Sequence, residues 1–519
     1  MKKGIVILLV LVSAILISWK GNEPAPGFKT KISEINLKAN LTYLASDELE
    51  GREAGTRGET VASGFISSEL KKYGVLPFGD NGTYFQNYNL ATTIADSTSE
   101  ITLLDASGKE QKTFHQKLDI LIGSGCVKDI NVTTDFVFVG YGITADEYQY
   151  DDYKGLDVKG KVVVAIEGEP ENGNSTYFHG ADESKYSETA TKVKIAQSKG
   201  AIAILLTSKS VKTRGWERVA RRMTAPSTDV APDAENGVMP YVVLKETTIE
   251  QLLAGNKTDY NSILKSVESK SVIPKFTVQG QLKLKIKAEK SNLIKSRNII
   301  GMIEGNDPVL KNQFVAVSAH YDHVGVSKGE VYNGADDDGS GTVGVLEVAR
   351  VLSADKNHKR SFLIIFHAAE EKGLLGSEYL TSHFSRMRDI VSLVNMDMIG
   401  REYQDSIHVI GSDKLSKDYH NLIIAANKKT VNMTFDFKYN EPSDPNRFYY
   451  RSDHYNYAKN GIPIVFFFDD MRRDYHQASD EVQFIDFTKI AKVATLAYTI
   501  SMDVANLDNR LKVDSEPKN

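Results

Sequence analysis

Five apolar runs in the second half of the chain constrain its fold more than any other feature of the sequence. They lie at Asn298–Ile303, Phe314–Ala319, Ser361–Ala368, Ile390–Met396 and Pro463–Phe468. Several of them are apolar throughout, which is typical of strands that helices cover on both faces of a sheet. Helix-like segments such as Gly341–Ser353 fall between them. This repeat of strand, loop and helix predicts an α/β fold with a mostly parallel, mixed sheet flanked by helices.

The first half of the chain has a different character. Residues 30–74 are expected to be helical, with a break at GREAGTRGE and a second helix over Glu59–Tyr73. From about residue 84 to residue 290, short β-type runs such as Phe136–Ile143 and Lys161–Ile166 dominate. One helix is predicted over Glu188–Lys199, and the arginine-rich stretch Lys209–Gly237 is predicted to be a loop. This region is therefore predicted to be a mainly-β unit inserted into the α/β domain.

These changes of character give a division of the chain. Residues 1–20 are expected to be a signal peptide or anchor, and residues 21–110 the N-terminal part of the α/β domain. The insert is placed at 111–288, the core of the α/β domain at 289–510 and a polar tail at 511–519.

The N-terminus has the form of an export signal. Lys2 and Lys3 precede an apolar run from Ile5 to Ile17, which is shorter than the roughly 20 residues that span a bilayer. We therefore expect an exported protein, periplasmic or secreted, which stays tethered to the membrane if the segment is not cleaved. No other contact with a membrane is expected.

Composition excludes several classes of function. The chain has 63 Lys+Arg against 68 Asp+Glu, a net charge of −5, which argues against nucleic-acid binding by bulk charge. Cys126 is the single cysteine, so neither an intramolecular disulfide nor a cysteine-based zinc site can form. Any metal must be held by histidines and carboxylates. The sequence does not indicate an oligomeric state.

Histidines and carboxylates follow the predicted strands, where an open α/β sheet binds its ligands. They are His320, Asp322 and His323 after the second run, Asp336, Asp337 and Asp338 before the helix, Glu370 and Glu371 after the third run, Asp397 after the fourth, and His476 and Asp480 after the fifth. Tyr475 directly precedes His476. Two imidazoles with three or more carboxylates exceed what one zinc ion needs. This set suits a two-metal site, in which a carboxylate bridges ions about 3.5–4 Å apart.

The motifs that carry these residues resemble the co-catalytic di-zinc aminopeptidase family. They are SAHYDHVG, NGADDDGSGTVGVLEVAR, HAAEEKGLLGS, NMDMIG, YRSDHYNYAKNGIP and DYHQASD, in the family order. Glutamate carboxypeptidase II, the transferrin receptor and glutaminyl cyclase are further relatives. The region from about Gly123 to Ser208 resembles the protease-associated (PA) domain that many members carry as an insert. The resemblance implies a zinc exopeptidase fold and two zinc ions per chain.

The resemblance also implies roles for individual residues. His320 and Asp397 would hold one zinc ion, Glu371 and His476 the other, and Asp337 would bridge the two. Glu370 would be the general base, and Tyr475 would donate a hydrogen bond to the developing oxyanion. Asp322 would orient His320, and Asp480 is expected to do the same for His476. Arg451 matches a position that contacts substrate in some relatives. The chain departs from many relatives at Asp338, where they have Asn, so an extra acid follows the bridging residue.

Other histidines are expected to have ordinary roles. His323 is not expected to be a ligand. His367 is expected in the core or behind the ligands. His454 belongs to a motif expected to serve loop structure and substrate contact. The leading interpretation is an aminopeptidase that acts on peptides with a free N-terminus. A carboxypeptidase or dipeptidase of the same fold, and a non-catalytic binding protein like the transferrin receptor, are the alternatives.

Overall fold

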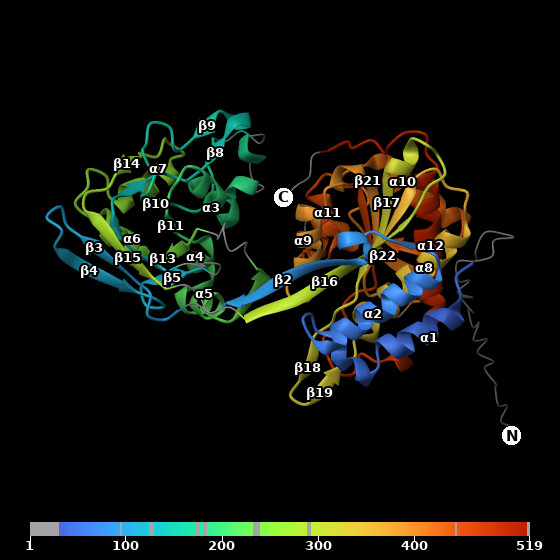
Figure 1. The fold of residues 1–519 in the computed structure, drawn as a ribbon. Coiled ribbons are helices and arrows are strands. Elements are labelled where there is room, and N and C mark those ends of the chain that lie inside the picture. The colour runs from blue at the N-terminus through green and yellow to red at the C-terminus, as the bar shows by residue number, and fades with distance from the viewer. Residues whose placement is uncertain are drawn as a thin grey trace, which may run out of the picture.

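A computed structural model describes most of the chain. It covers residues 31–93, 96–123, 129–172, 174, 177–179, 184–231, 239–287, 292–401, 403–441 and 444–515. The predicted signal segment, Cys126 and the last residues of the predicted tail lie outside these ranges. Within them, no helix combines the length and the apolar character needed to cross a bilayer. Figure 1 shows two bodies side by side, joined by the paired strands β2 and β16.

A ten-stranded mixed sheet forms the centre of the larger body. Its order is β12-β2-β16-β20-β17-β21-β24-β22-β23, and β1 pairs with β16. The strands are β1 Leu76–Pro77, β2 Phe85–Thr93, β12 Ser227–Val230, β16 Asn292–Ile303, β17 Phe314–His320, β20 Ser361–His367, β21 Ile390–Met396, β22 Ser406–Ile410, β23 Thr434–Asp436 and β24 Ile464–Phe468. Strands β20, β17, β21 and β24 run parallel. All five apolar runs are strands of this sheet, so the predicted fold class is confirmed.

Helices cover both faces of this sheet, which explains the apolar runs. They are α1 Glu34–Leu44, α2 Arg57–Lys72, α8 Gly341–Ala354, α9 Leu375–His383, α10 Lys417–Lys429, α11 His454–Ala458 and α12 Phe487–Ala505. Along β17, Val315 and Val317 belong to the apolar cluster that includes α8 and α12. Phe314 and Ala316 point the other way, into the cluster that includes α9 and α11. Alternate side chains of a strand face opposite sides, so both faces of the sheet had to be apolar.

The smaller body contains two further sheets. One has the order β14-β7-β10-β11-β13-β5 and the other β4-β3-β15-β6, beside a small β8–β9 pair. The strands are β3 Glu100–Leu104, β4 Glu110–His115, β5 Ile120–Ile122, β6 Ile130–Thr134, β7 Phe136–Phe138, β8 Thr144–Ala145, β9 Tyr150–Asp151, β10 Val162–Ala165, β11 Ala203–Leu206, β13 Tyr241–Leu244, β14 Phe276–Thr277 and β15 Gln281–Ile286. The helices are α3 Thr189–Ser198, α4 Lys209–Arg214, α5 Trp216–Met223, α6 Glu246–Leu253 and α7 Tyr260–Glu268.

Two features of this insert differ from the sequence prediction. Strands β3 and β4 pair with each other, and β3 pairs with β15, so the insert begins before residue 111. Residues 209–223, predicted as loop, form α4 and α5. Val219 and Ala220 of α5 pack on Leu121 and Val243 of the sheet. The many basic residues of this segment made such a contact impossible to predict from the sequence.

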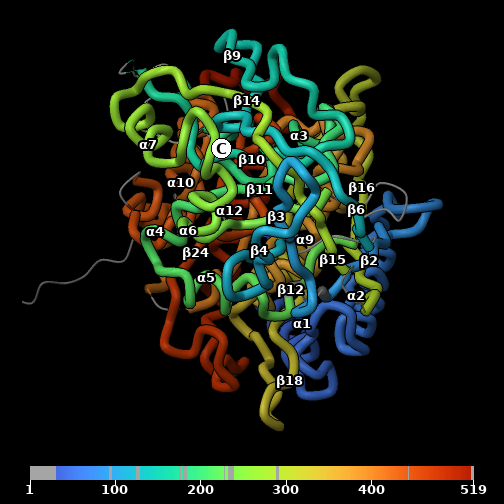
Figure 2. Tube along the Cα trace, turned by 90° about the vertical axis from the view of Figure 1, so that its left-hand side faces the viewer, coloured from blue at the N-terminus to red at the C-terminus, as the bar shows by residue number. Residues whose placement is uncertain are grey.

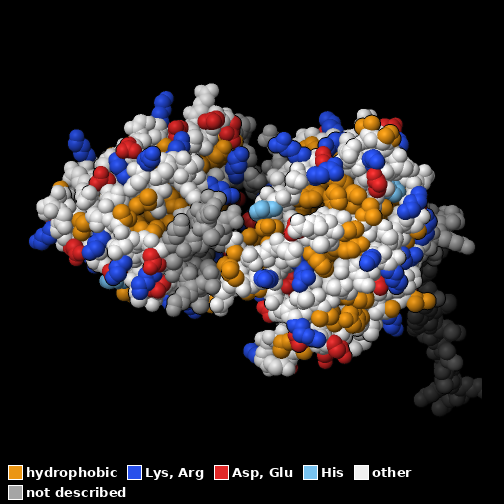
Figure 3. Space-filling model, in the orientation of Figure 1, with side chains coloured by type: hydrophobic (Ala, Val, Ile, Leu, Met, Phe, Trp, Pro, Cys, Tyr) orange, Lys and Arg blue, Asp and Glu red, His pale blue; other side chains and the backbone are white. Residues whose placement is uncertain are grey.

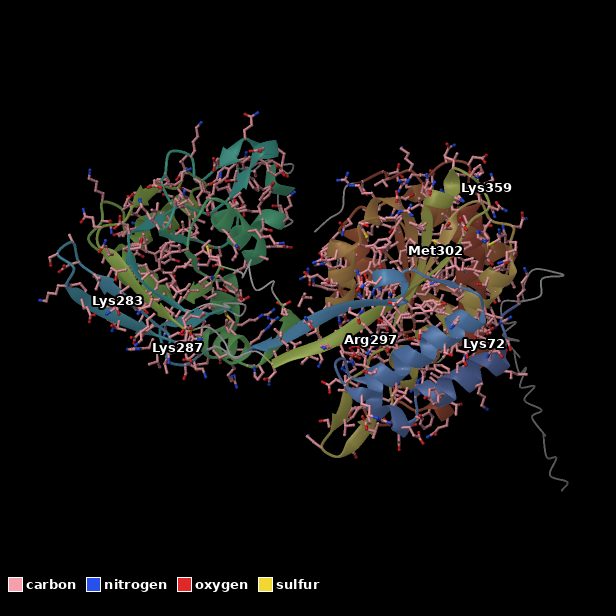
Figure 4. The ribbon with its side chains drawn as sticks, viewed as in Figure 1. Lys72, Lys283, Lys287, Arg297, Met302 and Lys359 are labelled. Atoms are coloured by element: carbon pink, nitrogen blue, oxygen red, sulfur yellow. The ribbon has the colours of Figure 1, made fainter. Side chains whose placement is uncertain are left out.

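The connection between the two bodies is an antiparallel ribbon. Strand β16 pairs with β2 from Asn292 with Thr92 to Ile299 with Phe85. Figure 4 shows the path of the chain: Lys287 lies at the insert, Arg297 on the ribbon and Met302 in the larger body. Seen from the side, the insert lies in front of the larger body (Figure 2). Basic and acidic side chains are interspersed on the face shown in Figure 3, in keeping with the weak net charge.

The break predicted between the two N-terminal helices contains a buried arginine. Arg52 is 1% exposed, and its guanidinium donates hydrogen bonds to four backbone carbonyl groups. The acceptors are the oxygens of Leu44, Tyr321, Asn333 and Gly334, at 2.7, 2.8, 2.6 and 3.0 Å. Three of these carbonyl groups belong to the loops that follow β17 and precede α8, so Arg52 joins the N-terminal helices to the sheet edge.

We predict that Arg52→Met lowers the free energy of unfolding by about 3 kcal/mol or more, because it leaves several buried carbonyl groups without a donor. Urea unfolding of the two proteins measures the difference. The control is Arg57→Met, because Arg57 is exposed and its contact with Glu50 is 3.6 Å long. We expect a change within about 0.5 kcal/mol for the control. Equal effects of the two substitutions would contradict this role of Arg52.

Candidate metal centre

The carboxyl ends of the parallel strands bring the predicted ligands together. His320 is the last residue of β17, and Asp397 directly follows β21. Glu371 lies just after β20, and His476 in the loop after β24. Asp337 lies in the irregular segment Ala335–Ser340, which leads into α8. Residues that are up to 156 positions apart in sequence therefore share one site.

One group of ligand atoms consists of His320, Asp337 and Asp397. The Nε2 atom of His320 lies 3.3 Å from Oδ1 of Asp337 and 3.5 Å from Oδ1 of Asp397. All three residues are buried.

A second group forms around the other oxygen of Asp337. The Nε2 atom of His476 lies 3.1 Å from Oδ2 of Asp337 and 2.9 Å from Oε2 of Glu371. The two oxygens of Asp337 thus face different groups. This is the arrangement that a carboxylate bridging two metal ions requires.

His323 joins the second group, although the sequence analysis did not expect it there. Its Nδ1 atom lies 2.9 Å from Oε1 of Glu371 and 3.8 Å from Oδ2 of Asp337. The chain leaves the sheet after His320, so neither strand nor helix periodicity could give the direction of a side chain three residues later. Its nearness to His320 in a strand-end loop was the one available signal.

The donor set fits a divalent metal such as zinc. Imidazole nitrogens and carboxylate oxygens are ligands that zinc takes in catalytic sites. Oδ2 of Asp337 and Nε2 of His476 are buried, and although they lie 3.1 Å apart, neither makes a hydrogen bond of acceptable geometry among the described residues. Without a cation, burial would lower the pKa of His320, but Asp397 and Glu370 outweigh burial and raise it well above the ordinary value. Such a concentration of negative charge calls for positive charge at its centre.

Asp322 lies where the sequence analysis predicted it. Its Oδ1 atom is 3.7 Å from Nδ1 of His320, on the side of the ring away from Asp337. The same oxygen accepts a hydrogen bond from the backbone N–H of Glu370, at 3.2 Å. Asp322 therefore supports both the histidine and the turn after β20.

Asp480 has a different partner from the one predicted. No contact between Asp480 and His476 is found among the described residues. Its carboxylate instead accepts hydrogen bonds from the backbone N–H groups of Asp336 and Asp337, at 3.0 and 3.1 Å. It therefore holds the segment that carries Asp337, which the sequence could not indicate because the two segments are 143 residues apart.

The extra acid at Asp338 faces the backbone rather than the ligand groups. Its carboxylate accepts hydrogen bonds from the N–H groups of His320, Gly341 and Met398, at 3.2, 2.9 and 3.1 Å. It thus links three of the segments that surround the site.

A chain of buried hydrogen bonds reaches Asp397 from the sheet. Ser318 donates to Asn395 at 2.6 Å, and Asn395 donates to Ser452 at 2.9 Å. Ser452 in turn donates to Oδ2 of Asp397 at 2.7 Å, which leaves Oδ1 facing His320. The motif around Ser452 is evident in the sequence, but this contact with Asp397 is not.

A cleft opens beside the two groups. Its lining consists of Asp337, Glu370, Asp397, Met398, Phe448, Arg451, Phe466, Phe468, Met471 and Tyr475. The ring of Tyr475 stacks on that of His476, with centroids 3.9 Å apart. The guanidinium of Arg451 lies 5.0 Å from the centroid of Phe448. The three remaining predicted site residues, Glu370, Tyr475 and Arg451, thus all border the cleft.

His367 lies in the core, whereas His454 is the first residue of α11 and is not among the described residues that line the cleft. His367 is fully buried and lies 3.3 Å from the hydroxyl of Tyr457, and burial lowers its pKa to about 3. His454 is fully buried, lies 2.9 Å from the carbonyl oxygen of Tyr449 and stacks on Phe466.

The chain is similar in sequence to known peptidases. Residues 298–501 match the family described as Peptidase family M28. This part of the chain belongs to peptidase family M28. Residues 124–252 match the PA domain, the insert that the resemblance implied.

Two curated relatives illustrate the extent of the likeness. Aminopeptidase YwaD of Bacillus subtilis (strain 168) is 36% identical over 381 residues, which cover 72% of this chain and 64% of that protein. Leucine aminopeptidase 1 of Sclerotinia sclerotiorum is 31% identical over 229 residues, which cover 40% of this chain and 56% of that protein. The chain thus spans less than two thirds of the length of each relative. A solved structure, the aminopeptidase from Aneurinibacillus sp. strain AM-1, is 18% identical, with a TM-score of 0.47 and coverage of 93% of this chain and 96% of that chain.

Proposed function

We propose that this M28 peptidase is a zinc-dependent aminopeptidase with two zinc ions per chain. One observation carries the proposal: the two oxygens of Asp337 face separate groups of histidine and carboxylate ligands, at 3.3 Å from His320 and 3.1 Å from His476. His320 and Asp397 would complete one metal position. Glu371 and His476 would complete the other, with His323 beside them. The names of the aminopeptidase relatives support the same assignment.

Zinc ions in such positions act as Lewis acids toward a peptide carbonyl and a water molecule. Glu370 is suited to move the proton, because its side chain borders the cleft and belongs to neither ligand group. It would take a proton from the attacking water and return it to the leaving amine. The hydroxyl of Tyr475, on the same cleft, would donate a hydrogen bond to the carbonyl oxygen as negative charge develops there.

The cleft also supports a substrate class. Its carboxylates attract the ammonium group of a free N-terminus, and its apolar side is formed by Met398, Phe448, Phe466, Phe468 and Met471. We propose peptides with an apolar N-terminal residue, in keeping with the name of the leucine aminopeptidase relatives.

A carboxypeptidase or dipeptidase activity is the second candidate. Arg451 favours it, because a guanidinium on the cleft would bind a C-terminal carboxylate.

Zinc analysis and a substrate panel test the proposed activity. We expect about two zinc ions per chain, hydrolysis of leucine anilide, and no hydrolysis of the same substrate with an acetylated N-terminus. Asp337→Ala should lower both zinc content and activity, because one carboxylate serves both positions. About one zinc ion per wild-type chain after reconstitution would overturn the bridging role. Cleavage of N-terminally blocked peptides from their C-terminus would favour the carboxypeptidase.

Neighbouring acids provide a matched test of the proton transfer. We predict that Glu370→Gln retains zinc and loses kcat by about 10²–10⁴-fold, because it removes only the acid–base group. Glu371→Gln should instead lower zinc content, because it removes a ligand. Metal analysis and steady-state kinetics of both variants measure this. The assignment is wrong if Glu370→Gln loses zinc while Glu371→Gln keeps it and only turns over more slowly.

We also propose export of the protein, on the basis of the Lys2–Lys3 start and the apolar run Ile5–Ile17. Expression of the full chain, fractionation of the cells and N-terminal sequencing of the product measure this. We expect protein outside the cytoplasm, shortened if the segment is cleaved. Full-length protein confined to the cytoplasm would contradict export.

A further inference from the structure

A buried arginine lies among three carboxylates beneath the metal centre. Arg401 is 8% exposed and follows β21. Its Nη2 atom donates to Oδ1 of Asp480 at 2.8 Å and also donates to Asp474. Its Nε atom is 3.8 Å from Oδ2 of Asp336, an oxygen without a hydrogen-bond partner among the described residues.

These carboxylates belong to two segments that supply ligands. Asp336 directly precedes Asp337, and Asp480 holds the backbone N–H of both residues. Asp474 lies two residues before His476, in a stretch without regular helix or strand. One guanidinium therefore joins the segment of Asp337 to the segment of His476.

The other ligand group has separate support. His320 and Asp397 stand at the ends of adjacent parallel strands, β17 and β21. Ser452 holds Asp397, and Asp322 lies beside His320. Among the described residues, Arg401 makes no hydrogen bond or ion pair with any of these four side chains. Arg401 therefore supports the metal position formed by Asp337, Glu371 and His476.

We propose that Arg401 is a positioning residue that sets the zinc affinity of the position formed by Asp337, Glu371 and His476. It contacts neither the cleft nor a ligand side chain, and it acts through Asp480 and Asp474. Without it, the buried carboxylates of Asp336 and Asp480 and the partly exposed carboxylate of Asp474 would lose their common cation, and repulsion among them would separate the two segments. This inference rests on the proposed two-zinc centre.

An arginine suits this role better than a lysine. Its planar guanidinium offers several donors in fixed directions, so it serves two carboxylates at once. Nη1 also reaches the carbonyl oxygen of Phe484 at 3.4 Å, and the guanidinium lies 5.6 Å from the ring of that residue. A lysine would place its charge in the same region, but its single ammonium group could not donate to the two carboxylates and the carbonyl group in these directions.

Zinc titration of the metal-free protein against a chromophoric chelator tests the inference. We compare the wild type with Arg401→Gln and Arg401→Lys, after circular dichroism has confirmed that each is folded. In Arg401→Gln we expect the zinc ion held by Glu371 and His476 to bind about 10–100-fold more weakly. The zinc ion held by His320 and Asp397 should lose less affinity, because of its ligands only Asp337 lies in a segment that Arg401 supports. Arg401→Lys should recover part of this loss.

Arg360→Gln is the matched control. Arg360 is 1% exposed and donates to Gln313 and to carbonyl oxygens of Val504 and Leu507, with no ion pair among the described residues. We expect it to lower stability and leave both zinc affinities unchanged. Unchanged zinc binding in Arg401→Gln, or equal weakening in both arginine variants, would overturn the inference.

Two further results keep the test decisive. If Arg401→Gln does not fold, Asp474→Asn takes its place, because Asp474 is partly exposed and joins only the His476 segment to the guanidinium. Weaker binding of one zinc ion supports the role, and unchanged binding overturns it. A wild-type protein that binds fewer than two zinc ions overturns the proposed metal centre itself, whereas a normal wild type with an unaffected variant overturns the inference alone.

Discussion

The shared carboxylate of Asp337 is the interaction on which the rest of the site depends. One oxygen faces His320 and the other faces His476, and the residue is 3% exposed. A buried carboxylate in a fixed position needs a fixed backbone, and the segment Ala335–Ser340 is irregular. Hydrogen bonds to other segments therefore fix its geometry. Asp480 accepts hydrogen bonds from the N–H groups of Asp336 and Asp337. Asp338 accepts them from the N–H groups of His320, Gly341 and Met398.

This arrangement concentrates buried negative charge, and the fold compensates for it locally. Backbone N–H groups donate hydrogen bonds to the carboxylates of Asp338 and Asp480. Arg52 and Arg401 add two buried guanidinium groups beside residues 333–336, one bound to carbonyl groups and the other to carboxylates. The compensation uses groups that cannot dissociate or move far, so the ligand carboxylates are left to bind a cation.

The PA domain is attached in a way that preserves this centre. The chain leaves the M28 domain through β2 and returns through β16, which are paired along eight residues of each strand. Between them the chain also touches this sheet through β12, which pairs with the outer edge of β2. The insert thus begins and ends on one antiparallel ribbon at one side of the central sheet (Figure 1). The strands that carry ligands, β17, β20, β21 and β24, lie on the far side of β16 from this ribbon's partner β2. The sheet edge at which the ligands meet is therefore uninterrupted.

The sequence by itself determined the five core strands, the helices between them and the identity of five candidate ligands. It could do so because burial on both faces forces continuous apolar runs, and because parallel strands bring their carboxyl ends to one edge. Only the tertiary structure decided the place of His323, the partner of Asp480, the contact of Ser452 with Asp397 and the packing of α5. Each of these depends on loops or surfaces that meet across tens to hundreds of residues. Such contacts leave no periodic pattern in the sequence, since hydrogen-bond geometry in irregular segments is set by what packs against them.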